Sequence, residues 1–223
     1  SKGGELLRVH DVGSLTTPLL WRGRGRSALI YMTLIFATNN KNKILEVSQI
    51  IGNQFIIKTL NEINCFEDLP ETQPTFEGNA LQKARHVYDN YGPVNCFSED
   101  TGLEVEALDG APGVITARYA GTGVASDNMN LLLKNLGDNP NRKAQFRTVF
   151  ALLLDGKEYL FEDVCKGSIR FEQSGEGGFG YDPIFEPDGY DVTFAEMDKS
   201  IKNVISHRGK AMRKMIAFLE RGF

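Results

Sequence analysis

The chain has 223 residues, a formal net charge of −4, and hydrophobic and charged fractions of 41% and 24%. These values are typical of a globular protein, and the length predicts one generous α/β domain or two lobes that share a core. The acidic balance argues against a nucleic-acid polymer as partner, because surfaces that bind such polymers are usually basic. No apolar run reaches the roughly 20 residues of a membrane span. A single nucleotide remains compatible with this composition.

Residues 1–31 differ from the rest of the chain. They are rich in arginine and glycine, show little periodicity and contain the only tryptophan, Trp21. We interpret them as a disordered leader added for expression, and 32–223 as a single two-lobed domain. An arginine-rich transit peptide and a native extension are the alternatives. The three cysteines form no Cys-x-x-Cys pair, which argues against a zinc site and favours a reducing compartment. They are Cys65, Cys96 and Cys165.

The first half of the chain reads as alternating strands and helices. Residues 34–37 predict a buried strand, 38–40 a polar turn, and 44–51 a helix that Gly52 ends. A strand over 55–60, a surface loop over 61–76 and a helix over 76–88 follow. Strands are predicted over 94–98 and 103–107. We therefore expect Glu99 and Asp100 at the C-terminal end of a strand, where ligands gather in open α/β sheets.

The second half adds a hairpin. Ser126 and Asp127 are expected to cap a helix that runs through 136, and Asp155-Gly156 predicts a tight turn between strands 146–154 and 157–165. The stretch 175–180 is a glycine-rich loop. Ser206 is expected to cap a last helix whose core face carries Ala211, Met215, Phe218 and Leu219. Because the hairpin interrupts an alternating αβ order, a mixed sheet with helical flanks is predicted.

Four short polar segments lie beside these elements, at 38–43, 98–102, 177–183 and 206–210. The first would aim helix-start amides and Lys43 at an anion. The second would offer Glu99 and Asp100 to a magnesium ion or to an attacking water, with Glu77 as a third oxygen donor. Taken singly, each segment also fits a plain helix cap or a solvated turn. Together they favour a magnesium-bound nucleotide.

The last two segments suit a base. Phe179 offers a face for stacking, and Asp182 could accept hydrogen bonds from ring N–H groups. His207, Arg208 and Lys199 would donate to a keto oxygen, whereas adenine presents an amino donor at that place. The pattern therefore favours 6-oxo purines over adenine.

From Leu34 to about Leu219 the chain resembles the inosine triphosphate pyrophosphatase family. The resemblance rests on T-N-N-K-N-K, F-E-G-N-A at 76–80, E-D-T-G at 99–102, and A-P-G and A-R-Y between 111 and 119. It continues through G-G-F-G-Y-D-P, A-E-M at 195–197, Lys199 and S-H-R at 206–208. T-N-N stands where many bacterial members have T-G-N, and E-D-T where many have D-D-S. Both departures bear on specificity rather than on activity.

The resemblance implies an elongated mixed β-sheet with flanking helices that form two lobes around a central cleft, in a homodimer. It implies hydrolysis of the inosine, deoxyinosine and xanthosine triphosphates ITP, dITP and XTP to a monophosphate and pyrophosphate. The cofactor would be Mg²⁺, and water activated by Asp100 would attack the α-phosphorus. A cytoplasmic enzyme is expected. A non-hydrolytic nucleotide-binding sensor on the same fold and a pyrophosphatase with another base preference remain the alternatives.

The resemblance also assigns residues. Glu77 and Asp100 would bind the metal, with Glu99 as a further candidate. The substrate would contact residues from all four polar segments and one lysine between them. These are Thr38, Asn39, Asn40, Lys41, Asn42, Lys43, Thr101, Phe179, Gly180, Tyr181, Asp182, Lys199, His207 and Arg208.

Overall fold

The computed structural model describes residues 7–8, 32–53 and 55–221. The predicted leader lies outside these residues except for β1 (Leu7–Arg8), which pairs in parallel with Tyr159–Leu160. The other strands are β2 (Thr33–Phe36), β3 (Ile56–Lys58), β4 (Cys96–Val105), β5 (Lys143–Leu154), β6 (Lys157–Ile169) and β7 (Phe185–Pro187). The α-helices are α1 (Lys41–Ile51), α2 (Phe76–Asn90), α3 (Ala125–Leu136), α4 (Lys199–Ile205) and α5 (His207–Glu220). Short 3₁₀ helices are η1 (Asn61–Ile63), η2 (Glu106–Leu108), η3 (Gly113–Arg118) and η4 (Asp182–Ile184).

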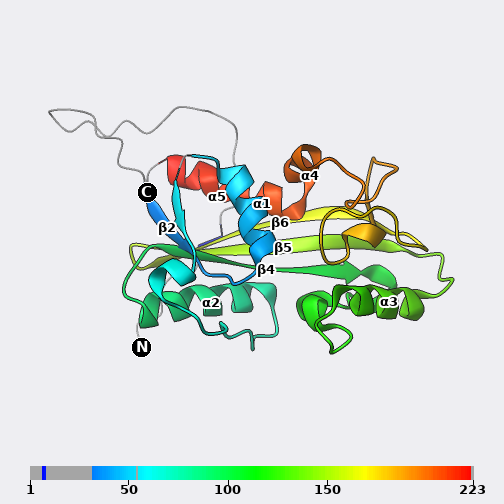
Figure 1. The fold of residues 1–223 in the computed structure, drawn as a ribbon, viewed down its shortest axis with the longest axis horizontal. Helices are drawn as coiled ribbons and strands as arrows, with labels where there is room; N and C mark the ends of the chain where they lie inside the picture. The colour runs from blue at the N-terminus through cyan, green and yellow to red at the C-terminus, as the bar shows by residue number, and fades with distance from the viewer. Residues whose placement is uncertain (1–6, 9–31, 54, 222–223) are drawn as a thin grey trace.

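The strands form one mixed sheet in the order β1-β6-β5-β4-β2-β3, and β7 pairs with the far end of β6. The strand β2 runs parallel to β3 and β4, whereas β4, β5 and β6 are antiparallel to their neighbours. In Figure 1 the sheet is elongated, with α1, α4 and α5 on one face and α2 and α3 on the other. The predicted mixed sheet with flanking helices is confirmed.

The apolar runs of the central strands are continuous because both faces of the sheet are covered there. Along β2, Leu34 and Phe36 face the core under α1 and α5, whereas Ile35 faces the core against α2. Along β5, Phe150 likewise faces the core under α1 and α5, and Val149 faces the core against α2. A third core packs α3 against the outer parts of β4, β5 and β6. We call the elements around the first two cores the first lobe, and those around the third the second lobe.

Two local predictions are confirmed. Asp155 and Gly156 have φ angles of 49° and 76°, as the two-residue turn of a tight hairpin requires. The side chain of Ser206 accepts a hydrogen bond from the backbone N–H of Gly209 at 3.1 Å and so caps α5. Of the predicted core face of α5, Phe218 is partly buried, and the other three residues are fully enclosed: Ala211, Met215 and Leu219.

The predicted break after residue 98 is wrong. The strand β4 is continuous and pairs with β5 along its whole length, so Glu99 and Asp100 lie in mid-strand. Gly102 does not interrupt the ladder, and its lack of a side chain lets the Gly113 carbonyl approach closely. The pair still lies beside a strand end, because β2 stops at Phe36, opposite Phe97. We therefore still expect a ligand beside Glu99 and Asp100, because the neighbouring strand β2 ends there rather than because β4 does.

Three helix starts also differ from expectation. Asn40 caps α1, so Lys41, Asn42 and Lys43 belong to its first turn rather than to a loop. The helix α3 begins at Ala125 after Val124, with no side-chain cap. Asp127 lies inside its first turn, where its negative charge interacts favourably with the positive end of the helix dipole. The short helix α4 was not predicted. Across the described parts of the chain, no helix has the length and apolar character needed to cross a membrane.

Candidate active site

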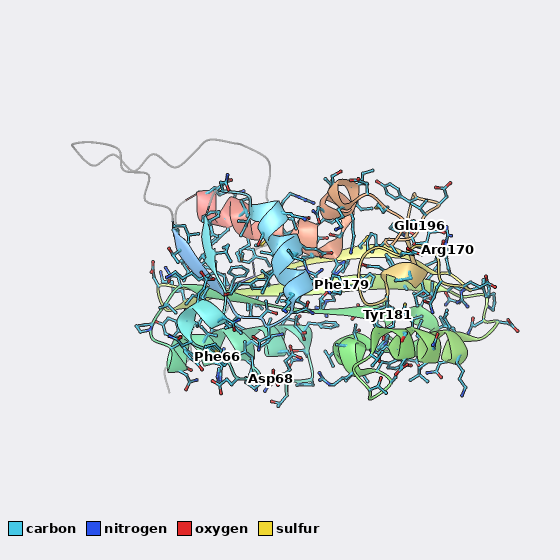
Figure 2. All side chains as sticks on the ribbon, viewed as in Figure 1. Phe66, Asp68, Arg170, Phe179, Tyr181 and Glu196 are labelled. Atoms are coloured by element: carbon cyan, nitrogen blue, oxygen red, sulfur yellow. The ribbon has the colours of Figure 1, made fainter. Side chains whose placement is uncertain are left out.

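A cavity of about 610 Å³ lies between the two lobes. Three of the four polar segments line it, together with η3 and the loop that precedes α2. Figure 2 shows Phe179 and Tyr181 on one side of this region and Asp68 on another. The predicted residues on the lining are Thr38, Asn39, Asn40, Asn42, Lys43, Asp100, Thr101, Phe179, Gly180 and Tyr181. The fourth segment, at the start of α5, is buried behind this lining.

The first polar segment is held by its own side chains. Asn40 Oδ1 accepts from the backbone N–H groups of Asn42 and Lys43 at 3.0 and 3.2 Å. Asn39 Nδ2 donates to the carbonyl of Glu67 at 3.1 Å, which ties the segment to the loop before α2. Two first-turn amides are thus already engaged, so the lysine and amide side chains carry the potential for anion binding. Lys41 is exposed.

Two of the carboxylates that line the cavity, Glu71 and Asp100, lie around one buried lysine. Lys83, from α2, donates to Glu71 and to the carbonyl of Glu99 at 2.8 Å, and its Nζ lies 3.8 Å from Asp100 Oδ1. Glu71 and Asp100 line the cavity from the loop and from β4. Arg118, from η3, lies 3.6 Å from Glu71. The pair of carboxylates is therefore set among positive charges, as a site for phosphate and metal requires.

The predicted metal ligand Glu77 lies elsewhere. It pairs with Arg147 at 2.8 Å, and Arg147 pairs in turn with Glu162 at 2.7 Å. Glu77 is not among the residues that line the cavity. The structure thus brings Asp100 together with Glu71 rather than with Glu77.

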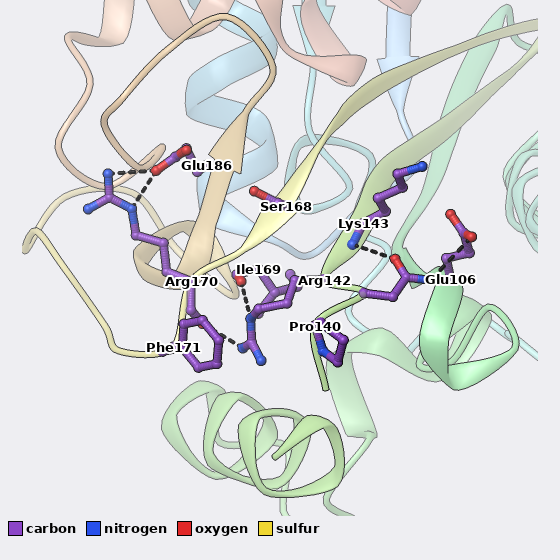
Figure 3. A pocket seen from close by; sticks show the side chains of 10 residues that line it. Glu106, Pro140, Arg142, Lys143, Ser168, Ile169, Arg170, Phe171 and Glu186 are labelled. Atoms are coloured by element: carbon purple, nitrogen blue, oxygen red, sulfur yellow. Dashed lines mark hydrogen bonds and ion pairs between the residues drawn. The ribbon is translucent and has the colours of Figure 1, made fainter. Parts of the chain in front are cut away.

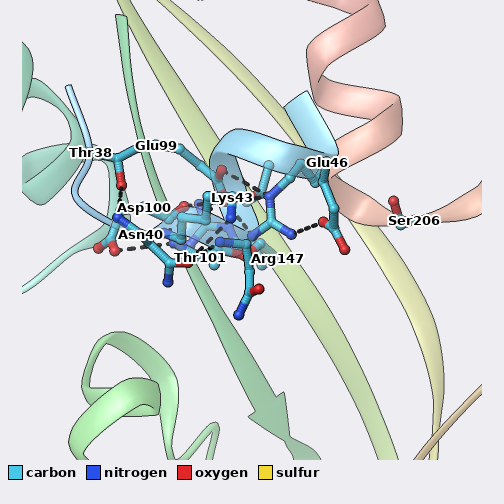
Figure 4. A network of polar contacts seen from close by, with 12 residues as sticks. Thr38, Asn40, Lys43, Glu46, Glu99, Asp100, Thr101, Arg147 and Ser206 are labelled. Atoms are coloured by element: carbon cyan, nitrogen blue, oxygen red, sulfur yellow. Dashed lines mark hydrogen bonds and ion pairs between the residues drawn. The ribbon is translucent and has the colours of Figure 1, made fainter. Parts of the chain in front are cut away.

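Glu99 points away from the cavity into a buried ion-pair network (Figure 4). Arg208 Nε and Nη2 donate to its carboxylate at 2.7–3.0 Å, and Arg208 Nη1 donates to Glu46 of α1. Burial alone would raise the pKa of Glu99, but Arg208 and Lys43 hold that pKa well below its usual range. Glu99 is therefore a permanent anion that joins β4 to α5 and α1. The Arg208 guanidinium is engaged within the protein in this structure.

Asp100 has a different environment from Glu99. Burial raises the pKa of Asp100, and the charges of Lys83 and Lys43 oppose that rise. Its Oδ1 accepts from the backbone N–H of Thr101 at 3.1 Å, and its Oδ2 accepts from Asn79 Nδ2 at 3.1 Å. A carboxylate with a raised pKa beside a water-accessible cavity suits proton abstraction. Of the acidic pair, only Asp100 is placed to act on a ligand.

The glycine-rich segment packs on a second buried ion pair. Lys202 Nζ donates to Asp182 Oδ2 at 2.6 Å and to Glu46 Oε1 at 2.9 Å. Asp182 also accepts from the backbone N–H of Phe179 at 2.7 Å. A side chain at Gly178, whose φ is 73°, would collide with the Asp182 carboxylate. The loop is therefore fixed with its aromatic ring held at the cavity.

Phe179 lies over two cations. Lys202 Nζ and Arg208 Cζ are 5.3 and 5.4 Å from its ring centroid. The ring lines the cavity and is partly exposed there, so an approaching base could stack on it. Lys199, which was predicted for this role, is exposed at the first position of α4. Lys202, one turn later, is the lysine that packs behind the Phe179 ring, although it does not line the cavity itself.

The remaining predicted residues hold the lining in place. His207 is stacked on Phe146 at a centroid distance of 4.7 Å, and its Nδ1 is buried without a hydrogen-bond partner among the described residues. The hydroxyl of Tyr181 donates to the Thr116 carbonyl at 3.0 Å, and that of Thr101 donates to the Arg147 carbonyl at 2.8 Å. These contacts join η3 and β5 to the cavity wall.

A second cavity, of about 680 Å³, lies at the outer end of the second lobe (Figure 3). Arg142 occupies its centre, and its guanidinium donates to three backbone carbonyls at 2.5–3.1 Å while packing on Phe171. Arg170 beside it pairs with Glu186. These cations hold strand ends together, so the cavity between the lobes is the better candidate for chemistry.

Sequence reasoning missed four site residues: Glu46, Glu71, Lys83 and Lys202. Glu71 lies in a stretch that polarity and proline marked as a surface loop. Lys83 and Glu46 lie within predicted helices, where charged residues are usually solvated. Lys202 is the exception. It lies four residues, about one helical turn, before the Ser206 cap, and this spacing could have indicated that Lys202 points in the same direction as Ser206.

Comparison with known proteins identifies the family. The family model described as the Ham1 family matches residues 34–218. The chain belongs to the Ham1 family. A dITP/XTP pyrophosphatase of Flavobacterium johnsoniae is 54% identical over 189 residues, which covers 84% of this chain and 98% of that protein. The predicted resemblance is thus confirmed.

Solved Ham1 structures have the same fold. The Ham1 protein of Staphylococcus aureus superposes with a TM-score of 0.78 and 36% identity, covering 86% of this chain and all of that one. A HAM1 protein from Coxiella burnetii gives a TM-score of 0.79 and 33% identity, again over 86% and 100% of the two chains. The mixed α/β architecture described above is therefore that of the Ham1 family.

Proposed function

We propose that the chain hydrolyses non-standard purine nucleoside triphosphates, dITP, ITP and XTP, to the nucleoside monophosphate and pyrophosphate. The observation that carries this proposal is Asp100, a buried carboxylate that faces the cavity beside two lysines, the half-buried Lys43 and the buried Lys83. Relatives named as dITP/XTP pyrophosphatases support the choice of substrate class.

In this proposal Asp100 orients a water molecule and takes its proton as the water attacks the α-phosphorus. The raised pKa of Asp100 helps it to accept that proton. Lys43 lies at the start of α1, where its charge and the positive end of the helix favour the phosphate chain. Pyrophosphate leaves with developing negative charge, which these positive groups stabilise.

The carboxylates fit a divalent cation, which we propose to be Mg²⁺. Among the described residues no group of three or more His, Cys, Asp or Glu could enclose a metal. A pair of carboxylates, Glu71 and Asp100, does face the cavity, and Mg²⁺ typically binds one or two carboxylates together with phosphate oxygens and waters. Such a cation, when bound, neutralises charge on the phosphates. We assign it to Glu71 and Asp100 instead of the predicted Glu77.

Recognition of the base falls to the other end of the cavity. Phe179 offers its exposed face for stacking, while Lys202 and Arg208 lie behind it. The 6-oxo group of hypoxanthine or xanthine accepts hydrogen bonds, whereas the amino group of adenine donates them, so in this proposal one of these cations turns from its carboxylate partners toward a 6-oxo base. His207 keeps one ring nitrogen unpaired at this end. The homodimer and the cytoplasmic location stay predictions from the resemblance.

The site of attack can be read directly from an isotope experiment. Hydrolysis of dITP in ¹⁸O-enriched water, with Mg²⁺, should place the label in deoxyinosine monophosphate and leave pyrophosphate unlabelled. Label in pyrophosphate would place the attack on the β-phosphorus and remove Asp100 from the role proposed here. Tight binding of dITP without any product would favour the nucleotide sensor instead.

A further inference from the structure

One enclosed amide connects Glu71 and Asp100, two of the carboxylates that line the cavity. Asn79 lies in the first turn of α2 and is 0% exposed. Its Oδ1 accepts from the backbone N–H of Gln73 at 2.8 Å, and its Nδ2 donates to Asp100 Oδ2 at 3.1 Å. A backbone N–H can only donate, so the orientation of the amide is fixed and its NH₂ group must face the carboxylate.

Each of these two bonds acts on a different carboxylate. Gln73 follows Glu71 by two residues, so the first bond anchors the loop that carries Glu71. The second bond holds the carboxylate of Asp100, which comes from β4. Asn79 does not line the cavity, and any effect on a ligand must pass through these partners. Rotating the amide would leave buried polar groups unpaired, which makes the linkage stiff.

We propose that Asn79 is a positioning residue, which sets the carboxylates of Glu71 and Asp100 at the separation needed to share one divalent cation. The inference rests on the proposed function for its catalytic consequence, but the geometry of cation binding can be tested without turnover. Partners that orient metal-binding side chains typically change metal affinity or activity by about 10- to 100-fold.

The same helix supplies a matched control. The side chain of Gln82 accepts from the backbone N–H of Thr72 at 2.9 Å and donates to Thr72 Oγ1 at 2.9 Å. It therefore also ties the Glu71 loop to α2, but no contact of Gln82 reaches Asp100. Asn79→Leu removes both bonds of the linkage at similar volume, whereas Gln82→Leu removes only a tether of the loop. Asn79→Ala replaces Asn79→Leu if the larger side chain prevents folding.

The test measures Mn²⁺ binding to the nucleotide-free protein by electron paramagnetic resonance, together with kcat and KM for dITP. Asn79→Leu should lower both Mn²⁺ affinity and kcat by about 10- to 100-fold. Its KM for dITP should change by less than about threefold, because the substrate contacts are intact. Gln82→Leu should stay within about threefold of wild type in all three quantities.

Two results would overturn the proposal. One is a folded Asn79 variant that binds Mn²⁺ as tightly as wild type. The other is a Gln82 variant that loses as much as the Asn79 variant, which would reduce Asn79 to one of two loop tethers. Failure of wild type to hydrolyse dITP would count against the proposed function alone, since Mn²⁺ binding still decides the role of Asn79.

Discussion

Glu99 and Asp100 are adjacent in sequence but have opposite environments, because successive residues of a strand point to opposite sides. Glu99 is enclosed in a network with Arg208 and Glu46, and its pKa is held well below the usual range. Asp100 faces the cavity, and its pKa is raised by burial. The two carboxylates therefore divide into a structural anion and a candidate base.

Replacing the candidate base isolates its chemical role. Asp100→Asn keeps the shape of the side chain but cannot accept a proton, so kcat for dITP should fall by about 10²- to 10⁴-fold. Binding of dITP, measured by isothermal titration calorimetry, should change far less than kcat. Unchanged turnover in this variant would exclude Asp100 as the base.

Arg208 is expected to affect stability as well as substrate recognition. Arg208→Ala leaves the fully buried Glu99 without its main partner, and breaking a buried pair in this way typically costs about 3–5 kcal/mol. Urea denaturation should show a loss of this size. The double variant Arg208→Met with Glu99→Gln should recover most of it, because neither member of this buried pair is then charged. A single variant as stable as wild type would contradict this structural role.

At the scale of elements, the short helix α4 decides which lysine packs behind Phe179 at the base end of the cavity. Lys202 is buried against Asp182 and Glu46, whereas Lys199 is exposed at the first turn. Lys202→Met should lower kcat/KM for dITP by at least about tenfold, since Asp182, which holds the backbone of Phe179, loses a charge-assisted hydrogen bond of roughly 1.5–3 kcal/mol. Lys199→Met is the matched control and should change kcat/KM little. Equal effects in the two variants would restore Lys199 as a substrate residue.

Sequence periodicity predicted those elements whose pattern is local. The hairpin turn at Asp155-Gly156 and the Ser206 cap depend on neighbouring residues, so both were predicted correctly. The continuity of β4 depends on its pairing with β5, about 45 residues later in the chain, and no local pattern near Gly102 reveals it. The same limit applies to Glu71, whose place beside Asp100 on the cavity lining depends on contacts between distant segments, so we propose it in place of Glu77 only from the structure.

At the scale of the whole molecule, the site lies where the two lobes meet. The buried His207 makes the free energy of unfolding of the protein depend on pH. Burial, followed by the charge of Arg208, holds the pKa of His207 well below its ordinary value of 6.5. The folded protein therefore keeps this histidine neutral, whereas the unfolded chain takes up a proton below about pH 6.5. The free energy of unfolding should then fall as pH falls through that range.

The size of this effect can be assigned to one residue. Between pH 6.5 and 5 the slope from His207 should approach about 1.4 kcal/mol per pH unit. His207→Phe, which keeps an aromatic ring against Phe146, should remove that component of the slope in urea denaturation measured across the range. An unchanged slope would show that the pKa of His207 is not lowered in the folded protein.

The measurement that tests the central claim most directly is pyrophosphate release from dITP and from dATP, each with and without Mg²⁺. We expect Mg²⁺-dependent release from dITP at a kcat/KM at least about 100-fold above that for dATP, since the amino group of adenine cannot accept the hydrogen bond that a 6-oxo group accepts. Comparable values for the two nucleotides, or release from dITP that needs no metal, would contradict the account of the cavity between the lobes.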